Sequence, residues 1–365
     1  MSVPGRGVQA PRLRASDTVP ANLPRQAPRR PTMRDVAALA GVSLSTVSRV
    51  VGGSQQVDPE LAVKVEKAVE MLGYRHNLAA GNLRRADGLS ASIGLVFEDV
   101  SNPFFSAVHR GVEDVARSRS VLTFAGSSDE DPARERELTE AFLGRRVDGL
   151  VIVPAAADHS YLARDVAAGM ALVFADRPPR FIDADAVVSD NVGGARTAVA
   201  HLAERGHRRI AFLGDQPDIF TAAERLRGYR EALAEHGGEP DEALVRHPAF
   251  RAVDVDATVR ELLGAADPPT ALFTAQNLIT LAALRTLHEL GLQHAVALVG
   301  FDDIPLAALL QPGVSVVAQD PYGLGRRAAE LLFSRLDGRR GPSRREVLPT
   351  TLIERGSGEI PRRPR

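Results

Sequence analysis

The segment 32–52 constrains this chain most, because its residues fit two short helices joined by a tight turn. Thr32 can cap the first helix, since its hydroxyl can accept a hydrogen bond from a free amide of the first turn. Val36 begins a series of apolar residues at helical spacing. Gly41 supplies the left-handed backbone that ends a helix, and Ser43 can cap the next one. This pattern predicts a helix-turn-helix unit, although an ordinary helical hairpin has the same pattern.

A third helix is predicted directly after this pair. Asp58 can cap it, Pro59 suits its first position, and Gly73 can end it. Between these ends, one face of the helix is apolar and carries Leu61, Val65, Val69 and Leu72. A short segment with two adjacent arginines, 74–85, follows the third helix.

Three motifs follow one another in this region: DVAALAGVSLSTVSRVV at 35–51, LGYRHN at 72–77 and NLRR at 82–85. In their order and spacing they resemble the DNA-binding headpiece of the lac repressor family of bacterial transcription factors. The resemblance implies that the second helix reads DNA. It implies the following DNA contacts: Thr32, Ser43, Leu44, Ser45, Thr46, Ser48, Arg49, Tyr74, Asn77, Ala80, Leu83 and Arg84.

The outward faces of the second helix suggest how these contacts are divided. We expect Leu44, Ser45 and Arg49 to reach base edges, because an arginine can donate two parallel hydrogen bonds to guanine. The hydroxyls at 43, 46 and 48 are expected mostly on phosphates. Gly52 stands where the family usually has Asn, so one phosphate contact is expected to be missing.

The segment 77–84 is too short to hold a helix alone in water, since isolated helices under about 12 residues are marginal. Gly81 weakens it further, by roughly 1 kcal/mol relative to alanine. We therefore expect it to fold against DNA, with Leu83 wedged between base steps in the minor groove and Arg84 near the backbone. In the alternative, Leu83 packs on the body as part of an ordinary linker.

Composition limits the class of protein. A length of 365 residues fits a small module plus a larger body, and the lack of cysteine excludes disulfides, thiolate nucleophiles and cysteine metal sites. No apolar stretch approaches the roughly 20 residues of a membrane span. The N-terminus has no apolar signal-peptide core, so we expect a cytoplasmic protein without a membrane partner.

Charge is distributed unevenly along the chain. Residues 1–31 carry a net charge of +5, residues 32–90 carry +1, and the remainder carries −7. A basic front end and an acidic body are typical of a nucleic-acid reader joined to a separate core. The first 31 residues are rich in Pro, Arg and Gly, so we predict a disordered basic tail there. We predict a second disordered tail at 357–365.

From residue 91, apolar strands alternate with helices, which predicts parallel sheets covered by helices on both faces. The first set has predicted strands at 93–97, 121–124, 149–153 and 171–174, and predicted helices at 104–119, 132–143 and 161–168. The second set has predicted helices at 194–205, 223–236, 253–263 and 278–290, and predicted strands at 210–214, 271–274 and 297–300. Two such sets form two lobes, and a ligand is expected in the cleft between them.

The body also resembles the lac repressor family, whose core is similar to periplasmic sugar-binding proteins. The motifs that carry this resemblance are SNPFF at 101–105, RVDG at 146–149, DRP at 176–178, RGHRRI at 205–210, RLRGY at 225–229, PTA at 269–271, GFDD at 300–303 and QDP at 319–321. The implied organisation is a headpiece at 32–76, a hinge at 77–90 and a two-lobed body at 91–356. The first lobe comprises about 91–188 and 319–348, and the second about 189–318 and 349–356.

Candidate ligand contacts follow the strand ends. Asp302 directly follows a predicted strand and can accept two hydroxyl hydrogen bonds, and Arg225 is expected to open a helix at the cleft. Phe104 and Phe105 offer apolar faces, although ordinary core packing explains them equally well. The remaining candidates are Asp176, Phe250, Gln276 and Asn277. At 275–277 this chain reads Ala-Gln-Asn where the family usually has Ala-Asn-Asp, so one negative charge is absent.

Signals of catalysis are weak. The chain has no phosphate-binding Gly-x-x-x-x-Gly-Lys-Ser/Thr motif. Its histidines are scattered, and His201 and His207 are expected on the surface or at helix caps. We therefore expect no catalytic residue, no metal and no cofactor. A sugar-binding transport protein or a sugar-acting enzyme on the same two-lobed fold remains the alternative.

The joined parts predict a dimeric transcription regulator on a pseudo-palindromic DNA operator, with a repressor as the expected type. Its partner in the cleft is expected to be a small-molecule effector: a sugar or derivative is favoured, and a nucleobase is the less favoured alternative.

Overall fold

The computed structural model describes residues 31–52, 57–75, 90–238, 240–248 and 252–362. The chain divides into two compact units, residues 1–85 and residues 86–365. Most of the predicted N-terminal tail and of the predicted hinge lies outside the described residues.

The first unit, which we call the headpiece, contains the three predicted helices. These are α1 (Met33–Ala40), α2 (Leu44–Val51) and α3 (Pro59–Leu72). The predicted caps are confirmed: Thr32 and Asp35 form a reciprocal capping box, and Gly41 adopts φ 65° at the end of α1. The small core of the headpiece is formed by Val36, Val47, Val65, Ala68 and Tyr74.

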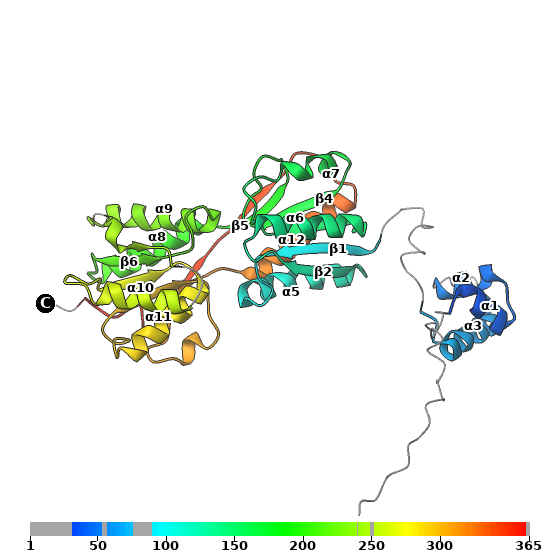
Figure 1. Cartoon of the computed structure of the whole chain (residues 1–365), viewed down its shortest axis with the longest axis horizontal. Coiled ribbons are helices and arrows are strands. Elements are labelled where there is room, and N and C mark those ends of the chain that lie inside the picture. The colour runs from blue at the N-terminus through cyan, green and yellow to red at the C-terminus, as the bar shows by residue number, and fades with distance from the viewer. Residues whose placement is uncertain (1–30, 53–56, 76–89, 239, 249–251, 363–365) are drawn as a thin grey trace, which may run out of the picture. The chain divides into compact units, whose positions relative to one another are not determined.

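The first lobe of the second unit is built on a parallel sheet with the strand order β11-β5-β4-β3-β1-β2. Its strands are β1 (Ser92–Phe97), β2 (Leu122–Ser127), β3 (Gly149–Ile152), β4 (Ala171–Asp176), β5 (Asp185–Ser189) and β11 (Arg345–Leu348). Its helices are α5 (Pro103–Ser118), α6 (Pro132–Gly144), α7 (Ala163–Ala167) and α12 (Pro321–Leu336). Figure 1 shows these helices around the sheet.

The second lobe has a sheet of strand order β12-β10-β9-β8-β6-β7, parallel except for the antiparallel β12. Its strands are β6 (Ile210–Leu213), β7 (Val245–Arg246), β8 (Ala271–Thr274), β9 (Ala297–Phe301), β10 (Ser315–Ala318) and β12 (Thr351–Ile353). Its helices are α8 (Asn191–Glu204), α9 (Phe220–Glu235), α10 (Ala252–Leu263) and α11 (Asn277–Glu289).

Helices cover both faces of each sheet, and the central strands are buried, as the continuous apolar strands predict, whereas the edge strands β2 and β11 of the first sheet carry exposed residues. In the first lobe, one core lies between the sheet and helices α5 and α12, and a second lies on the α6 side. In the second lobe, α10 and α11 cover one face, and α8 and α9 cover the other. The buried strands therefore fix the positions of the polar residues that follow their carboxyl ends.

The chain passes between the lobes three times. It leaves the first lobe after Ser189 at the end of β5 and returns between β10 and α12. The third passage lies between Leu348 at the end of β11 and Thr351 at the start of β12. These passages link the two sheets through short segments.

The prediction of a disordered tail from residue 357 is wrong for residues 357–362. The hydroxyl of Ser357 donates to the backbone carbonyl of Leu298 at 2.6 Å, and a ring nitrogen of His207 lies 2.8 Å from the carbonyl oxygen of Ile360. These contacts tie the segment to the second lobe. They lay beyond prediction because the segment 357–362 has no periodic pattern.

Candidate functional site

Helix α2 exposes most of the side chains that were predicted to contact DNA. Val47 is fully buried in the headpiece core, so the opposite side of the helix faces outward. That side carries Leu44, Ser45, Ser48 and Arg49, which are all exposed. Leu44 is 42% exposed at the first position of the helix, so its apolar side chain is available to a partner.

Hydroxyl groups cluster at the N-terminus of α2. The Oγ of Ser43 accepts a hydrogen bond from the backbone N–H of Thr46 at 3.1 Å, which confirms the predicted cap. The same oxygen lies 2.7 Å from the hydroxyl of Ser45 and 2.8 Å from that of Thr46. Hydroxyls at a helix N-terminus suit phosphate oxygens, since hydroxyls and helix N-termini both contribute phosphate contacts in DNA complexes.

Two predicted DNA contacts also have roles within the headpiece. Thr32 caps α1, and its hydroxyl donates to the carboxylate of Asp35 at 2.7 Å. Tyr74 is only 9% exposed and packs in the headpiece core, so its ring is largely withdrawn from the surface. The other predicted contacts lie outside the described residues: Asn77, Ala80, Leu83 and Arg84.

Between the two lobes, the predicted ligand contacts meet around one cavity. Its lining includes Phe104, Phe105 and Asp176 from the first lobe, and Arg225, Gln276, Asn277 and Asp302 from the second. The cavity has a volume of about 20 Å³, which is close to the space of a single water molecule. A sugar therefore needs the lobes or their side chains to move. Phe250 lies outside the described residues.

Two aspartates occupy corresponding positions in the two lobes. Asp176 ends β4 with φ 66°, and Asp302 follows β9 with φ 72°. Residues other than glycine that adopt this backbone concentrate at ligand sites. Burial raises the pKa of both carboxyl groups, while the guanidinium charges of Arg177 and Arg225 oppose the increase at Asp176 and that of Arg225 opposes it at Asp302. Asp302 also accepts a hydrogen bond from the side-chain amide of Gln319 at 2.5 Å.

The sequence predicted that Arg225 opens its helix, and this prediction is wrong. Helix α9 begins five residues earlier, at Phe220. The Nε of Arg225 donates to Oδ1 of Asn191 and its Nη1 donates to the carbonyl of Ala275, each at 2.8 Å. Its Nη1 also lies 3.7 Å from Oδ2 of Asp302. The side chain is thus a fixed, buried cation at the wall of the cavity.

The two phenylalanines serve both the core and the cavity. Phe104 and Phe105 belong to the core of the first lobe, and their ring centroids lie 5.1 Å apart in an edge-on arrangement. Phe105 also stacks on Phe97 at 6.1 Å. The structure therefore brings together the two roles that the sequence left open.

Gln276 and Asn277 stand where the family usually has Asn and Asp, and each has a defined structural role. The Oε1 of Gln276 accepts hydrogen bonds from the backbone N–H groups of Leu278 and Ile279, so Gln276 caps α11. The Nδ2 of Asn277 donates to Oδ1 of Asn102 in the other lobe at 2.8 Å. The side-chain amide of Gln276 therefore caps α11, and that of Asn277 joins the two lobes.

Several charged or polar residues of the cavity were not predicted from the sequence: Glu98, Arg177, Asp215, Thr221 and Gln319. Arg177 donates to Glu98 at 3.2 Å and to Glu130 at 2.9 Å. Asp215 follows β6 after one glycine, the same kind of strand-end position that singled out Asp302. That position was the signal that could have identified it.

Three buried oxygen atoms around the cavity have no hydrogen-bond partner among the described residues. They are Oδ1 of Asp176, Oδ1 of Asp215 and Oε1 of Gln319. Buried polar atoms in folded proteins are almost always hydrogen-bonded. The cavity therefore offers acceptors for a ligand that brings hydrogen-bond donors.

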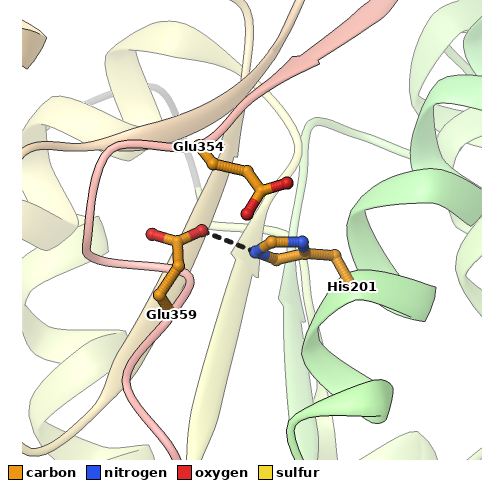
Figure 2. A group of neighbouring side chains, drawn as sticks. All are labelled: His201, Glu354 and Glu359. Carbon is orange, nitrogen blue, oxygen red and sulfur yellow. Dashed lines mark hydrogen bonds and ion pairs between the residues drawn. The ribbon is translucent and has the colours of Figure 1, made fainter.

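A second polar cluster lies away from this cavity. His201, Glu354 and Glu359 place potential metal-ligand atoms within 4.8 Å of one another (Figure 2). The ring Nε2 of His201 lies 2.7 Å from the carboxylate of Glu359, and Arg205 donates to Glu354 at 3.2 Å. These contacts fasten the C-terminal segment to α8. His201 and His207 are buried, so the expectation that they lie on the surface or at caps is wrong.

Among the described parts of the chain, no helix has the length and apolar character needed to cross a membrane.

Comparison with known families gives two matches. Residues 32–77 match the family of bacterial regulatory proteins called the lacI family, and residues 199–358 match a periplasmic binding protein-like domain.

Individual proteins are similar over nearly the whole chain. The HTH-type transcriptional regulator CelR of Thermobifida fusca is 37% identical, covering 90% of this chain and 99% of CelR. The HTH-type transcriptional regulator GalR of Escherichia coli (strain K12) is 31% identical, covering 90% of this chain and 96% of GalR.

Solved structures agree with these matches. The structure of a transcriptional regulator CelR-cellobiose complex is 35% identical, with a TM-score of 0.65 over 90% of this chain and 100% of that one. The lac repressor dimer bound to operator and the anti-inducer ONPF is 24% identical, with a TM-score of 0.78 over 90% of this chain and 99% of that one, and it supports the fold. The chain belongs to the lacI family of bacterial regulatory proteins and is a ligand-controlled, DNA-binding transcriptional regulator.

Proposed function

We propose that this chain is a cytoplasmic repressor that binds a pseudo-palindromic operator as a homodimer and releases or tightens its hold when a sugar-type effector enters the cleft. Two headpieces on a dimeric body would read two half-sites. The CelR complex contains cellobiose, and this supports a sugar-type ligand here as well.

One observation carries the effector assignment. Oxygen atoms of Asp176, Asp215 and Gln319 are buried around one inter-lobe cavity without a hydrogen-bond partner among the described residues. A polyhydroxylated ligand brings hydrogen-bond donors to such acceptors. Phe104 and Phe105 offer apolar contact to a sugar ring. Because residues from both lobes line the cavity, a ligand there changes the lobe geometry and with it the operator affinity.

For DNA, we propose that Leu44, Ser45 and Arg49 reach base edges, while the hydroxyls of Ser43, Thr46 and Ser48 fix the helix on phosphates. Their grouping on the outer side of α2 supports this division. Thr32, Tyr74 and the hinge residues Asn77 and Ala80 would add contacts beside the recognition helix.

In the hinge, we propose that Leu83 wedges into the minor groove while Arg84 approaches the backbone. Leu83→Ala is expected to lower operator affinity and reduce DNA bending in a gel-mobility assay. Equal affinity and equal bend would instead favour a leucine that packs on the body as an ordinary linker.

A thermal-shift screen tests the function most broadly. Sugars, sugar phosphates and nucleobases are added to the full chain with and without operator DNA selected from a random pool. We expect a sugar-type compound to stabilise the protein and to change operator binding. Failure to select any DNA would favour a transport protein, and chemical conversion of the stabilising compound would favour an enzyme.

A further inference from the structure

Charged side chains around the inter-lobe cavity do not balance. The first lobe contributes the carboxylates of Glu98 and Asp176, and the second lobe contributes those of Asp215 and Asp302. Against these four carboxylates stand two guanidiniums, those of Arg177 and Arg225. The formal excess is therefore two negative charges around the cavity.

The two arginines are already engaged. The Nη2 of Arg177 lies 3.2 Å from Oε2 of Glu98 and 2.5 Å from Oε1 of Glu130, and its Nε lies 3.5 Å from Oδ2 of Asp176. Arg225 is held by Asn191 and by the carbonyl of Ala275, with its remaining ion pair directed to Asp302. Neither arginine forms an ion pair with Asp215 among the described contacts.

Asp215 is the exception in this network. Its side chain is 7% exposed, and its Oδ1 is buried without a hydrogen-bond partner among the described residues. A buried carboxylate is costly unless a cation or several donors face it. Burial accordingly raises the pKa of Asp215 to about 7, and burial also raises the pKa of Glu98. The guanidinium charges of Arg225 and Arg177 oppose this increase at Asp215, but neither arginine pairs with it among the described contacts.

The chemistry of the missing partner follows from charge and hydrogen-bonding capacity. A phosphate or carboxylate would add to the negative excess. A hydroxyl can donate one hydrogen bond to Asp215 but leaves its charge uncompensated. An ammonium group is positively charged and donates three hydrogen bonds, so it answers both needs.

We propose that Asp215 of the second lobe and Glu98 of the first lobe form a subsite for an ammonium group, and that the effector is an amine-bearing sugar. This inference rests on the proposed function, in which the cleft is the effector site. Because the two carboxylates belong to opposite lobes, an ammonium between them draws the lobes together. Charge recognition is thereby coupled to the lobe movement that controls DNA binding.

Matched trios of ligands test the subsite on the full chain. Glucosamine, galactosamine and mannosamine are each compared with the parent hexose and with its 6-phosphate by calorimetric titration. We expect at least one amine to bind about tenfold or more tightly than its parent, since a hydrogen bond to a charged group is stronger than one between neutral groups. The phosphates are expected to bind most weakly. Affinity for the amine should pass through a maximum near neutral pH, because binding needs Asp215 as a carboxylate, with a pKa of about 7, and the amino sugar as an ammonium, which loses its proton as the pH rises further.

Two variants locate the effect. Asp215→Asn keeps the shape of the side chain and removes its charge, so the affinity ratio of amine to parent should fall toward one. Glu140→Gln removes an exposed carboxylate of α6 that pairs with Arg136, and it should keep the wild-type ratio. Circular dichroism checks the fold of both variants. If Asp215→Asn does not fold, the pH profile of the wild-type chain still decides.

Each outcome separates the subsite from the function. A parent sugar that binds as tightly as its amine, a phosphate that binds more tightly, or no binding by any amine overturns the subsite. If a neutral sugar nevertheless shifts operator affinity, the proposed function stands without the subsite. If an amine binds through Asp215 without changing operator affinity, the subsite stands and the proposed function fails.

Discussion

The side chains of Asn102 and Asn277 form an amide pair across the cleft, with Nδ2 of Asn277 2.8 Å from Oδ1 of Asn102. The return contact, from Nδ2 of Asn102 to Oδ1 of Asn277, is longer at 3.5 Å. Asn102 caps α5 in the first lobe, and Asn277 is the first residue of α11 in the second. The pair therefore joins the N-termini of two helices that belong to different lobes. Any ligand that opens the cleft must compete with this contact.

Replacing Asn277 should lower the unfolding free energy more than replacing Asn102. Asn277→Asp removes the donor to Asn102, whereas Asn102→Asp keeps the acceptor for Asn277 and the helix cap. Both variants add one negative charge, so each controls for the charge of the other. We expect Asn277→Asp to lose about 1–3 kcal/mol of unfolding free energy and Asn102→Asp to lose less. Urea denaturation measures both, and equal losses would show that the donor does not matter.

Asp302→Asn should remove the ligand response and leave the protein folded. The amide oxygen of Asn can still accept from Gln319, so the local contact survives while the buried charge disappears. The measurement is operator affinity with and without effector, together with circular dichroism. A folded Asp302→Asn protein with a normal response would place the effector elsewhere.

Arg225→Ala should behave differently from Asp302→Asn. It leaves Asp302 without its cationic partner and deprives Asn191 and the carbonyl of Ala275 of their donors. Removing one partner of a buried pair costs about 3–5 kcal/mol, so a large loss of unfolding free energy is expected in thermal denaturation. A loss below about 1 kcal/mol would show that the arginine is not integral to the second lobe.

The acidic cleft predicts a dependence of stability on pH. Burial raises the pKa of Asp215 from 3.8 to about 7, so the folded state holds a proton that the unfolded state releases in this interval. The unfolding free energy contributed by this group is therefore greatest below pH 4 and falls as the pH rises through 7. The unfolding free energy of Asp215→Asn, measured by urea denaturation at each pH, should depend less on pH in this interval. The wild-type value minus the variant value should therefore fall between pH 4 and pH 7. A difference curve without slope between pH 4 and 7 would contradict the buried, unpaired carboxyl.

Much of the architecture followed from sequence patterns. Pro59 and Gly73 marked the ends of a headpiece helix, and continuous apolar runs such as Ile210–Leu213 marked the buried parallel strands. Several strands were not predicted: β11 at Arg345–Leu348 alternates exposed and half-buried residues at a sheet edge, and β5 at Asp185–Ser189 is buried but begins and ends with a polar residue. The start of α9 was predicted too late, because its N-cap residue, Ile219, has no capping side chain.

The cleft was predictable only in part. Asp302 and Asp176 could be placed from strand ends and from the family resemblance. Arg177 and Asp215 follow the same logic, but their surroundings appear only in the folded chain: Arg177 pairs with Glu98 and Glu130, whereas Oδ1 of Asp215 has no hydrogen-bond partner among the described residues. A sequence shows which strand ends carry charges, but it does not show which charges lack a partner.

Specific DNA reading should depend on the planar fork of Arg49 and less on its charge. Arg49→Lys keeps the positive charge but loses the bidentate donor pair, so we expect a loss of about 1–3 kcal/mol in discrimination between operator and random DNA. Non-specific binding should change little. Fluorescence titration on both DNAs measures the ratio, and an unchanged ratio would assign Arg49 to a phosphate.

The central claim, that one ligand in the cleft controls the headpieces, is tested most directly by measuring both affinities in a closed cycle. Operator affinity is determined with and without saturating effector, and effector affinity is determined with and without saturating operator. Linkage requires the same factor in both directions, and a coupling of about 1–3 kcal/mol corresponds to a factor of about 5–150. We expect two equal factors within this range. If both ligands bind but neither changes the affinity for the other, the claim that the cleft ligand controls the headpieces is contradicted.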